Sequence, residues 1–312
     1  MNRALAMIVL AGCGGSSAPP DAAIAGPILD PALFDCTASG VPARASPIPV
    51  ACALDPGCRT PQVAAHRGAG GLLGVLAPED TLSAYRAGIA LGVEFVETDP
   101  RPTADGVLVN IHDTEVDRTT DGSGTVSDLT LAQVQALRIE PGTLAGDFSC
   151  ERIPTLLEVL QTCAGRVVVL VDANKTDRVD LLVQAIQDAD AVEWAIFDTS
   201  SIAKIDQALA IDPTLHFHIR PASETELVSQ LDHFAPRLPV IVELETADRQ
   251  AGSALVHQRG TRSLSDVFFE DAAAIGDPDV SPYAAIFDLG VDIVQSDRPD
   301  LVIEYLRQRG AR

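Results

Sequence analysis

Basic residues are scarce in this chain of 312 residues. Its 22 lysines and arginines face 44 aspartates and glutamates, so the net charge is −22 at pH 7. So negative a surface repels nucleic acid and anionic membranes at long range, and we expect neither as a partner. A phosphate-bearing ligand would have to be held by local positive charge, from an arginine or a metal ion, rather than by the field of the whole protein.

The sequence also contains no apolar run long enough to span a bilayer. A short positive start followed by the apolar stretch Ala4–Leu10 is typical of an export signal. The residues Leu10-Ala11-Gly12-Cys13 resemble the lipobox of bacterial lipoproteins, in which the cysteine is lipidated. We therefore expect a signal peptide over residues 1–12, lipidation of Cys13 and a flexible tether over residues 13–28. The protein would be exported and anchored in the bacterial envelope, with membrane contact only through its lipid.

Zinc-ligand spacings are absent among the cysteines, which argues against a structural metal site built from thiolates. Export allows disulfides to form instead. Five cysteines follow Cys13, namely Cys36, Cys52, Cys58, Cys150 and Cys163. We expect Cys150 to pair with Cys163, and two of the first three to pair with each other, which leaves one free thiol.

Short apolar runs alternate with amphipathic stretches from residue 63 onward. The expected strands are Val63–His66, Val93–Asp99, Val167–Asp172, Ala195–Asp198, Leu215–Ile219, Val240–Leu244, Arg262–Val267 and Asp292–Ser296. The expected helices include Thr81–Leu91, Arg178–Ala189, Ser201–Ile211, Ser223–Phe234, Ala247–Arg259 and Pro299–Arg309. This alternation predicts a parallel sheet covered by helices. Eight such units favour a closed (β/α)₈ barrel, of the TIM type, over residues 63–312, preceded by an N-terminal extension over residues 29–62.

One irregularity follows the second expected strand. Residues Thr103–Gly106 are typical of a turn, and Val107–Ile111 of a further strand. A long segment then precedes the third barrel strand, and Thr155 with Glu158 fits a capping box that starts a helix. We expect an insertion over about residues 103–165 that stands over the mouth of the barrel.

The carboxyl ends of the expected strands carry the residues that could do chemistry, because catalytic groups of such barrels lie at that end. Glu97 and Asp99 are two residues apart and share one face of a strand, and Asp172 ends the third strand. Carboxylates that converge on one barrel mouth repel each other unless a cation lies between them. The sequence therefore predicts a site for a hard divalent cation, Ca²⁺ or Mg²⁺.

The run VAAHRGAGG, then APEDT and GVEFVETDPRPTADGVLVNIHD, resembles the N-terminal signature of glycerophosphodiester phosphodiesterases. Later matches are GTVSDLTLAQVQAL, IPTLLEVL and LGVDIVQSDRPDLVIEYL, and the resemblance spans about residues 63 to 309. It implies metal-dependent hydrolysis of a small glycerophosphodiester to sn-glycerol 3-phosphate and an alcohol. It further implies roles for seven residues: His66 and His112 as acid–base pair, Glu97, Asp99 and Asp172 as metal ligands with Glu79 as a further ligand, and Arg67 as phosphodiester-binding residue.

The chain departs from the family pattern after its third strand. The family usually has Glu-x-Lys where this chain has Asp172-Ala173-Asn174-Lys175, and Asp80 replaces a usual asparagine. If the strand continues, Asn174 shares the inward face with Asp172 and takes the place of the lysine in substrate binding. If it ends near Ala173, Lys175 can swing back over the mouth. We expect the first arrangement.

Two other functions stay open. A lipid-directed phosphodiesterase, of the phospholipase D type found in sphingomyelinase D relatives, would share the barrel, both histidines and the acidic site. A hydrophobic rim would favour it, and no loop of the sequence clearly supplies one. A non-catalytic envelope lipoprotein could also retain the fold, although both histidines are present. Beyond these, we expect Asp297 to cap the last helix. We expect His216 and His218 to be rim or core residues, with His218 as a candidate substrate contact.

Overall fold

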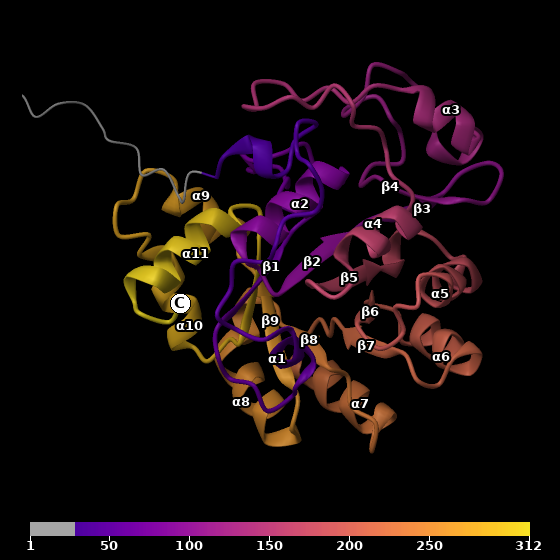
Figure 1. Cartoon of the computed structure of the whole chain (residues 1–312). Helices are drawn as coiled ribbons and strands as arrows, with labels where there is room; N and C mark the ends of the chain where they lie inside the picture. The colour runs from indigo at the N-terminus through magenta and orange to yellow at the C-terminus, as the bar shows by residue number, and fades with distance from the viewer. Residues whose placement is uncertain (1–28) are drawn as a thin grey trace, which may run out of the picture.

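The computed structural model describes residues 29–312, so the expected signal peptide, Cys13 and the tether lie outside the described residues. Eight parallel strands close into a barrel in the order β1-β10-β9-β8-β7-β6-β5-β2 (Figure 1). Their bounds are β1 (Gln62–Ala65), β2 (Phe95–Thr98), β5 (Val168–Asp172), β6 (Ala195–Thr199), β7 (His216–Ile219), β8 (Ile241–Glu243), β9 (Arg262–Asp266) and β10 (Ile293–Ser296). The predicted TIM barrel is confirmed, and each expected strand agrees with its observed bounds to within two residues.

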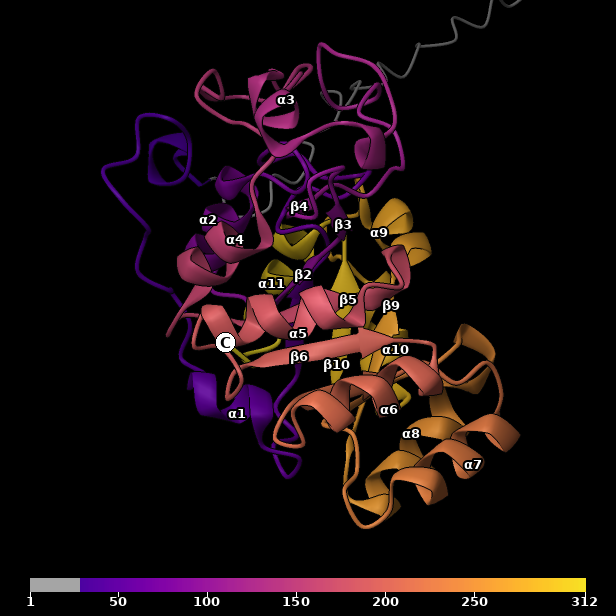
Figure 2. The ribbon, with the colours of Figure 1, turned by 90° about the vertical axis from the view of Figure 1, so that its right-hand side faces the viewer.

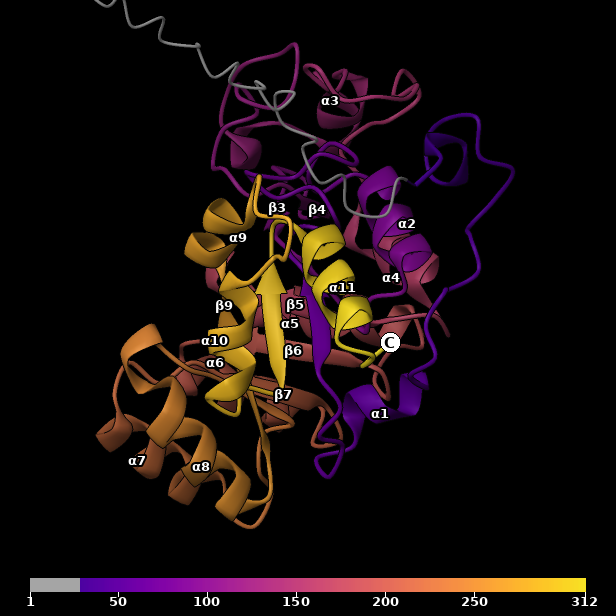
Figure 3. The ribbon, with the colours of Figure 1, turned by 90° about the vertical axis from the view of Figure 1, so that its left-hand side faces the viewer.

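Helices surround the barrel, as Figures 2 and 3 show from opposite sides. They are α2 (Leu82–Leu91), α4 (Leu156–Cys163), α5 (Val179–Asp188), α6 (Ile202–Ile211), α7 (Glu224–Phe234), α8 (Arg249–Arg259), α9 (Phe268–Ala274), α10 (Pro282–Asp288) and α11 (Pro299–Gln308). Capping residues determine where two of these helices begin. Thr81 accepts a hydrogen bond from the backbone of Ala84 at the start of α2, and Thr155 forms the predicted capping box with Glu158. Among the described residues, no helix combines the length and apolar character needed to cross a membrane.

The strands alternate between two cores. Residues that point outward, such as Val63, Val169 and Phe197, pack against the helices in the larger apolar cluster. Residues that point inward form a smaller cluster inside the barrel, which contains Ala64, Phe95, Val168, Leu170, Ile196, Ile241, Leu264 and Ile293. Because side chains alternate along a strand, the next inward position toward the carboxyl ends lies at the barrel mouth.

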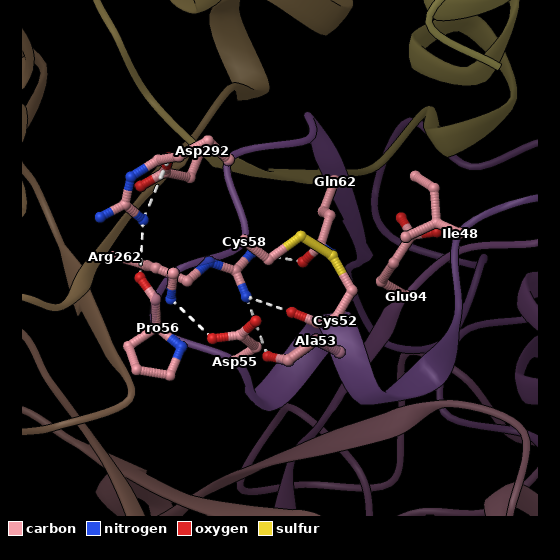
Figure 4. The surroundings of a disulfide bond; sticks show 12 residues. Ile48, Cys52, Ala53, Asp55, Pro56, Cys58, Gln62, Glu94, Arg262 and Asp292 are labelled. Carbon is pink, nitrogen blue, oxygen red and sulfur yellow. Dashed lines mark hydrogen bonds and ion pairs between the residues drawn. A yellow bond between two sulfur atoms is a disulfide. The ribbon is translucent and has the colours of Figure 1, made fainter.

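The N-terminal extension closes the opposite end of the barrel. Its helix α1 (Val50–Leu54) contributes Ala53 to the interior cluster, and the extension also holds η1 (Pro31–Leu33). Arg262 is fully buried beneath the interior cluster, where its guanidinium donates to the carbonyl oxygens of Cys52 and Ala53 and to the side chain of Gln62 (Figure 4). Burial lowers the pKa of Arg262 to about 10, which still leaves it charged at neutral pH. These bonds attach α1 to strands β1 and β9.

The segment between β2 and α4 folds beside the carboxyl ends of the barrel strands (Figures 2 and 3). It contains the antiparallel pair β3 (Pro100–Pro102) and β4 (Leu108–Asn110), then η2 (Val126–Asp128) and α3 (Leu131–Ala136). A separate apolar cluster, which includes Val109, Val116 and Val134, holds it together. The helix α4 that follows packs between α2 and α5 in the outer ring.

The disulfides differ from the predicted pairing. Cys36 pairs with Cys150, and Cys52 pairs with Cys58, so a pair among the first three cysteines is confirmed and Cys150–Cys163 is wrong. Cys163 of α4 is buried in the larger apolar cluster and is the free cysteine among residues 29–312. Cys150 instead lies on a loop against the extension, because the backbone of Cys36 donates to the carbonyl of Asp147 at 2.8 Å. The Cys36–Cys150 bond therefore ties the extension to the segment between β2 and α4.

Candidate active site

Three carboxylates meet at the barrel mouth, as the sequence predicts. Glu97 and Asp99 come from the end of β2 and Asp172 from the end of β5, and one oxygen of each lies within 4.8 Å of the others. All three are buried, and within residues 29–312 Asp99 Oδ2 accepts no hydrogen bond. Burial raises the pKa of Glu97, and the nearby charges of Asp99 and Asp172 raise it further. The trio fits a hard divalent cation, because only a positive charge between the carboxylates offsets both their burial and their mutual repulsion.

His66 directly follows β1, and a carboxylate holds it in place. Its Nδ1 lies 2.6 Å from Asp297 Oδ1, and its Nε2 lies 3.8 Å from Glu97 Oε2. Burial alone would raise the pKa of Asp297, but the hydrogen bond and charge of His66 outweigh it and lower the pKa. With Nδ1–H donating to Asp297, the Nε2 atom faces the carboxylate trio.

Asp297 does not cap the last helix, so the capping prediction is wrong. Helix α11 starts at Pro299 with Arg298 at its N-cap, and no side chain of the described part of the chain caps it. The second oxygen of Asp297 instead accepts a hydrogen bond from the backbone of Leu73 at 3.0 Å. A β-carbon at Gly71 would overlap the Asp297 carboxylate, so the glycine lets the loop after β1 approach it.

His112 follows the β3–β4 pair and has a carboxylate partner of its own. Its Nδ1 lies 2.8 Å from Asp113 Oδ1, while Asp113 Oδ2 accepts a hydrogen bond from Arg118 at 2.5 Å. The hydrogen bond from Arg118, together with that from His112, holds the pKa of Asp113 well below its usual range. The carbonyl oxygen of His112 accepts from Arg101 at 2.7 Å. Both histidines thus have Nδ1 next to a carboxylate, so Nε2 is the ring nitrogen on the side away from that carboxylate.

Glu79 lies outside the carboxylate trio and between two arginines. Arg67 donates to Glu79 Oε1 at 2.9 Å, and Arg118 donates to both oxygens at 2.8 and 2.6 Å. Burial alone would raise the pKa of Glu79, but the two arginines lower it. Glu79 therefore pairs with two arginines, and its carboxylate is not part of the cluster that Glu97, Asp99 and Asp172 form. Arg118 was missed by sequence reasoning, since it belongs to no motif.

The third strand has its expected end and does not continue through Asn174. It stops at Asp172, and residues Ala173–Lys175 form the 3₁₀ turn η3. Asp172 Oδ1 accepts from the backbone and the side-chain amide of Asn174, both at 2.6 Å, which directs Asn174 away from an extended course. Lys175 returns over the mouth, with Nζ 3.4 Å from Asp99 Oδ1 and 4.0 Å from Asp172 Oδ2. The favoured arrangement, with Asn174 in the place of the family's lysine, is therefore wrong, because Asp172 turns the chain.

This geometry can be set beside known proteins. Residues 66–302 match the family model described as "Glycerophosphoryl diester phosphodiesterase family". The chain belongs to this family, whose members are phosphoric diester hydrolases. It is 45% identical over 85 residues to a glycerophosphodiester phosphodiesterase of Caldanaerobacter subterraneus, a match that covers 27% of this chain and 34% of that protein. For the first curated relatives the matched stretch covers 27% to 43% of their length.

Solved structures of the family share the fold. A glycerophosphoryl diester phosphodiesterase from Parabacteroides distasonis superposes with a TM-score of 0.71 at 24% identity, over 83% of this chain and 90% of that one. A phosphodiesterase from Oleispira antarctica, solved in complex with the product sn-glycerol-3-phosphate, gives 0.63 at 22% identity, over 80% of this chain and 97% of that one. At these identities the likeness concerns the barrel itself.

The repulsion within the carboxylate trio predicts a stability effect. In a chelator, Glu97→Gln should raise the melting temperature, because a neutral amide replaces a buried carboxylate whose charge is disfavoured. About 1 kcal/mol of relief corresponds to roughly 1–2 °C, because the unfolding entropy is about 2.1 cal/mol/K per residue. The same substitution should weaken the stabilisation that Ca²⁺ or Mg²⁺ gives the wild type. Thermal melts in chelator and in each cation measure both effects.

The matched control is Glu115→Gln, an exposed residue away from the trio, which should change neither value. A Glu97→Gln protein that melts below the wild type in chelator, with an undiminished response to cations, would show that Glu97 is no ligand.

Proposed function

We propose that this protein hydrolyses glycerophosphodiesters to sn-glycerol 3-phosphate and an alcohol, using a divalent cation and two histidines. The observation that carries the proposal is the position of His66, with Nε2 3.8 Å from a carboxylate of the trio that fits the cation. Membership of the family supports the reaction type. The product bound to the relative from Oleispira antarctica supports a small glycerol phosphate as ligand here.

In the proposed reaction, different residues of the chain bind the cation and the phosphate group. A Ca²⁺ or Mg²⁺ ion held by Glu97, Asp99 and Asp172 would supply Lewis-acid chemistry and neutralise phosphate charge. Arg67 and Lys175 border the trio, at 3.5 and 3.4 Å from the oxygens of Asp99, and would bind the remaining phosphate oxygens. Their charge is local, as so acidic a protein requires.

The histidines would move the protons. One Nε2 atom removes a proton from the attacking water as its oxygen bonds to phosphorus, and the other protonates the alcohol oxygen as the P–O bond to it breaks. Each imidazolium that forms is stabilised by its own carboxylate, Asp297 for His66 and Asp113 for His112. The separate partners allow the two rings to hold opposite protonation states.

Substitution of either histidine tests this proposal. His66→Ala and His112→Ala should each lower kcat by at least about a hundredfold, the lower range of acid–base effects, while the melting temperature changes little. Release of glycerol 3-phosphate from glycerophosphocholine, with Ca²⁺ or Mg²⁺ and with a chelator, is the measurement. Chelation should abolish the release.

The control is His233→Ala, a surface residue paired with Asp206, which should keep the wild-type rate. Full activity in exhaustively chelated enzyme would exclude the metal role. Tight substrate binding without any turnover would favour the non-catalytic envelope module instead.

The turn after β5 predicts an order of effects at its two polar residues. Lys175→Ala should lower kcat/KM for glycerophosphocholine by about tenfold or more, because it removes a cation 3.4 Å from Asp99. Asn174→Ala should cost less, since the Asn174 side chain is exposed and bonds to Asp172 and to the residues Thr199 and Ser200. Steady-state kinetics compare the two variants. A larger loss in Asn174→Ala would mean that the amide, not the ammonium, binds phosphate.

A lipid-directed phosphodiesterase is the second candidate, favoured by exposed apolar side chains that the sequence did not reveal. Leu72 is 67% exposed and Val75 48% exposed in the loop after β1, and Phe269 is 79% exposed on α9, which follows β9. Since β10 alone separates β1 from β9, these side chains flank one sector of the mouth. Lysophosphatidylcholine as a second substrate in the release assay distinguishes the two functions.

We also propose that the protein is exported and lipidated at Cys13, because Leu10-Ala11-Gly12-Cys13 resembles a lipobox. The phosphodiesterase would then act outside the cytoplasm. Cys13→Ser should then move the protein from the membrane fraction to the soluble fraction, because the lipid chains supply the anchor. Fractionation followed by immunoblotting measures this shift. A variant that remains in the membrane fraction would overturn the lipidation proposal.

A further inference from the structure

A buried acid that the proposed reaction does not use lies against the loop that follows β10. Asp271 is on α9, and its side chain is fully buried. Its Oδ1 accepts hydrogen bonds from the hydroxyl groups of Tyr283 at 2.6 Å and Ser296 at 2.7 Å. Its Oδ2 accepts from the backbone N–H of Asp297 at 2.8 Å and of Arg298 at 3.4 Å. One carboxylate thus binds three consecutive residues at the point where β10 ends.

All four donors to Asp271 are neutral groups, so no cation offsets its burial directly. Burial raises the pKa of Asp271 to about 7, although the hydrogen bonds from Tyr283, Ser296 and the backbone of Asp297 lower it. An acid in such surroundings is costly, and an apolar side chain of similar volume would fill the same space at less cost. The carboxylate therefore points to a role for the hydrogen bonds that it makes to the loop after β10.

That loop carries the residue that orients His66. The backbone N–H of Asp297 donates to Asp271, while the side chain of Asp297 has Oδ1 2.6 Å from His66 Nδ1. The other side-chain oxygen of Asp297 accepts from the backbone of Leu73. Leu73 thus restricts the rotation of the Asp297 side chain, and Asp271 fixes the backbone from which that side chain extends. A shift of this backbone would move the carboxylate and with it the imidazole ring.

Asp271 can serve as a fixed point because its surroundings are well anchored. Arg249 of α8 donates to the Glu270 side chain and to the carbonyl oxygen of Asp266, both at 2.6 Å, which holds the start of α9. The buried Tyr283 on α10 packs against Tyr305 of α11, with ring centroids 6.1 Å apart. Helices α9 and α11 both contact β10, and α10 contacts α9 (Figure 3). Packing therefore fixes both the acid and its tyrosine partner.

We propose that Asp271 is a positioning residue, which holds the backbone of Asp297 and thereby keeps His66 in the geometry for proton transfer. This inference rests on the proposed function, in which His66 is one of the two acid–base groups. Asp271 acts only through Asp297 and has no contact with the reacting atoms. Active sites depend on such support, because a misplacement of about 1 Å can lower a rate by about a hundredfold.

The first test is kinetic. Asp271→Ala removes the acceptor for the Asp297 backbone and should lower kcat for glycerophosphocholine by about 10- to 100-fold. KM should stay near its wild-type value, because the buried Asp271 does not reach the substrate. Asp271→Asn should restore most of the rate. Its amide oxygen can accept from the Asp297 backbone, and its NH₂ group can donate to the two hydroxyls, which also act as acceptors.

The matched control is Asp292→Ala, since Asp292 is a buried acid at the opposite end of the same strand. Its Oδ2 accepts from the backbone of Ser263 at 2.9 Å and lies 2.8 Å from Nε2 of His257. Both alanine variants should lower the melting temperature, because each leaves buried donors unpaired, but only Asp271→Ala should lower kcat. An equal loss of kcat in both variants would show that Asp271 has a general structural role and would overturn the inference.

A milder variant covers the case in which Asp271→Ala does not fold. Ser296→Ala removes one of the hydroxyl groups that donate to Asp271 and deletes a single oxygen atom from the core. It should lower kcat by a smaller factor than Asp271→Ala, again with little change in KM. A wild-type kcat in Ser296→Ala, together with a wild-type kcat in Asp271→Asn or a loss there that matches Asp292→Ala, would then count against the inference.

A double variant tests whether Asp271 acts through His66. In the His66→Ala protein the ring that Asp271 helps to position is absent. Adding Asp271→Ala should therefore lower the residual kcat by no more than about twofold, the scatter expected for sites without a shared effect. Independent effects would multiply instead. A second loss as large as that in the wild-type background would overturn the inference.

A measurement without substrate separates this inference from the proposed function. The proton on His66 Nδ1, in its 2.6 Å contact with Asp297, should give a downfield proton NMR signal that is absent in His66→Ala. The signal should shift or disappear in Asp271→Ala and stay unchanged in Asp292→Ala. If the wild type hydrolyses no glycerophosphodiester, the proposed function fails, and this signal alone decides the role of Asp271. An unchanged signal in a folded Asp271→Ala protein, or its absence in the wild type, would overturn the inference.

Discussion

The repulsion among buried carboxylates at the barrel mouth is the constraint on which the rest of the site depends. Glu97, Asp99 and Asp172 are too close and too buried to be charged together without compensation. The chain provides part of it through Arg67 and Lys175, which approach Asp99 from either side. A divalent cation held by the three carboxylates would offset the remaining repulsion. Unrelieved repulsion of this kind lowers the stability of a fold, and such a cost is common at functional sites.

The inward positions of the barrel form separate levels, so the buried charges at the mouth do not interrupt the apolar interior below them. The apolar middle level, which includes Phe95, Leu170 and Leu264, keeps water away from the underside of the mouth. Below it, the buried Arg262 binds carbonyl oxygens of α1 and so attaches the extension that closes the barrel. At the upper level, the inward positions of β2, β5 and β6 carry the acids Glu97, Asp172 and Asp198. The charged groups therefore lie next to one another by strand geometry, without any need for motif residues to be close in sequence.

The sequence predicts those features of the structure that depend on local residue patterns. Strand positions follow from short apolar runs, and the residues just after them, such as His66, Glu97 and Asp172, follow from the rule that a barrel presents its carboxyl ends on one face. Contacts between distant segments were not recoverable. Asp297 meets His66 across 231 positions of sequence, and Arg118 meets Glu79 across 39. Cys150 was paired with the wrong partner for the same reason, since its neighbour in space is Cys36, 114 positions away.

The segment after β5 shows how a local departure from a family pattern can still place a lysine at the barrel mouth. A shorter acid, Asp172, replaces the usual glutamate, and its carboxylate is near enough to its own backbone to accept a hydrogen bond from the amide of Asn174. That bond ends the strand in a 3₁₀ turn, which advances the chain differently from an extended strand and brings the next residue, Lys175, back toward Asp99. In an extended strand Lys175 would face the helices. Asp172 is shorter than the usual glutamate, and Lys175 lies one residue later than the usual lysine. The hydrogen bond that Asp172 accepts from Asn174 redirects Lys175 to the mouth, so the first change offsets the second.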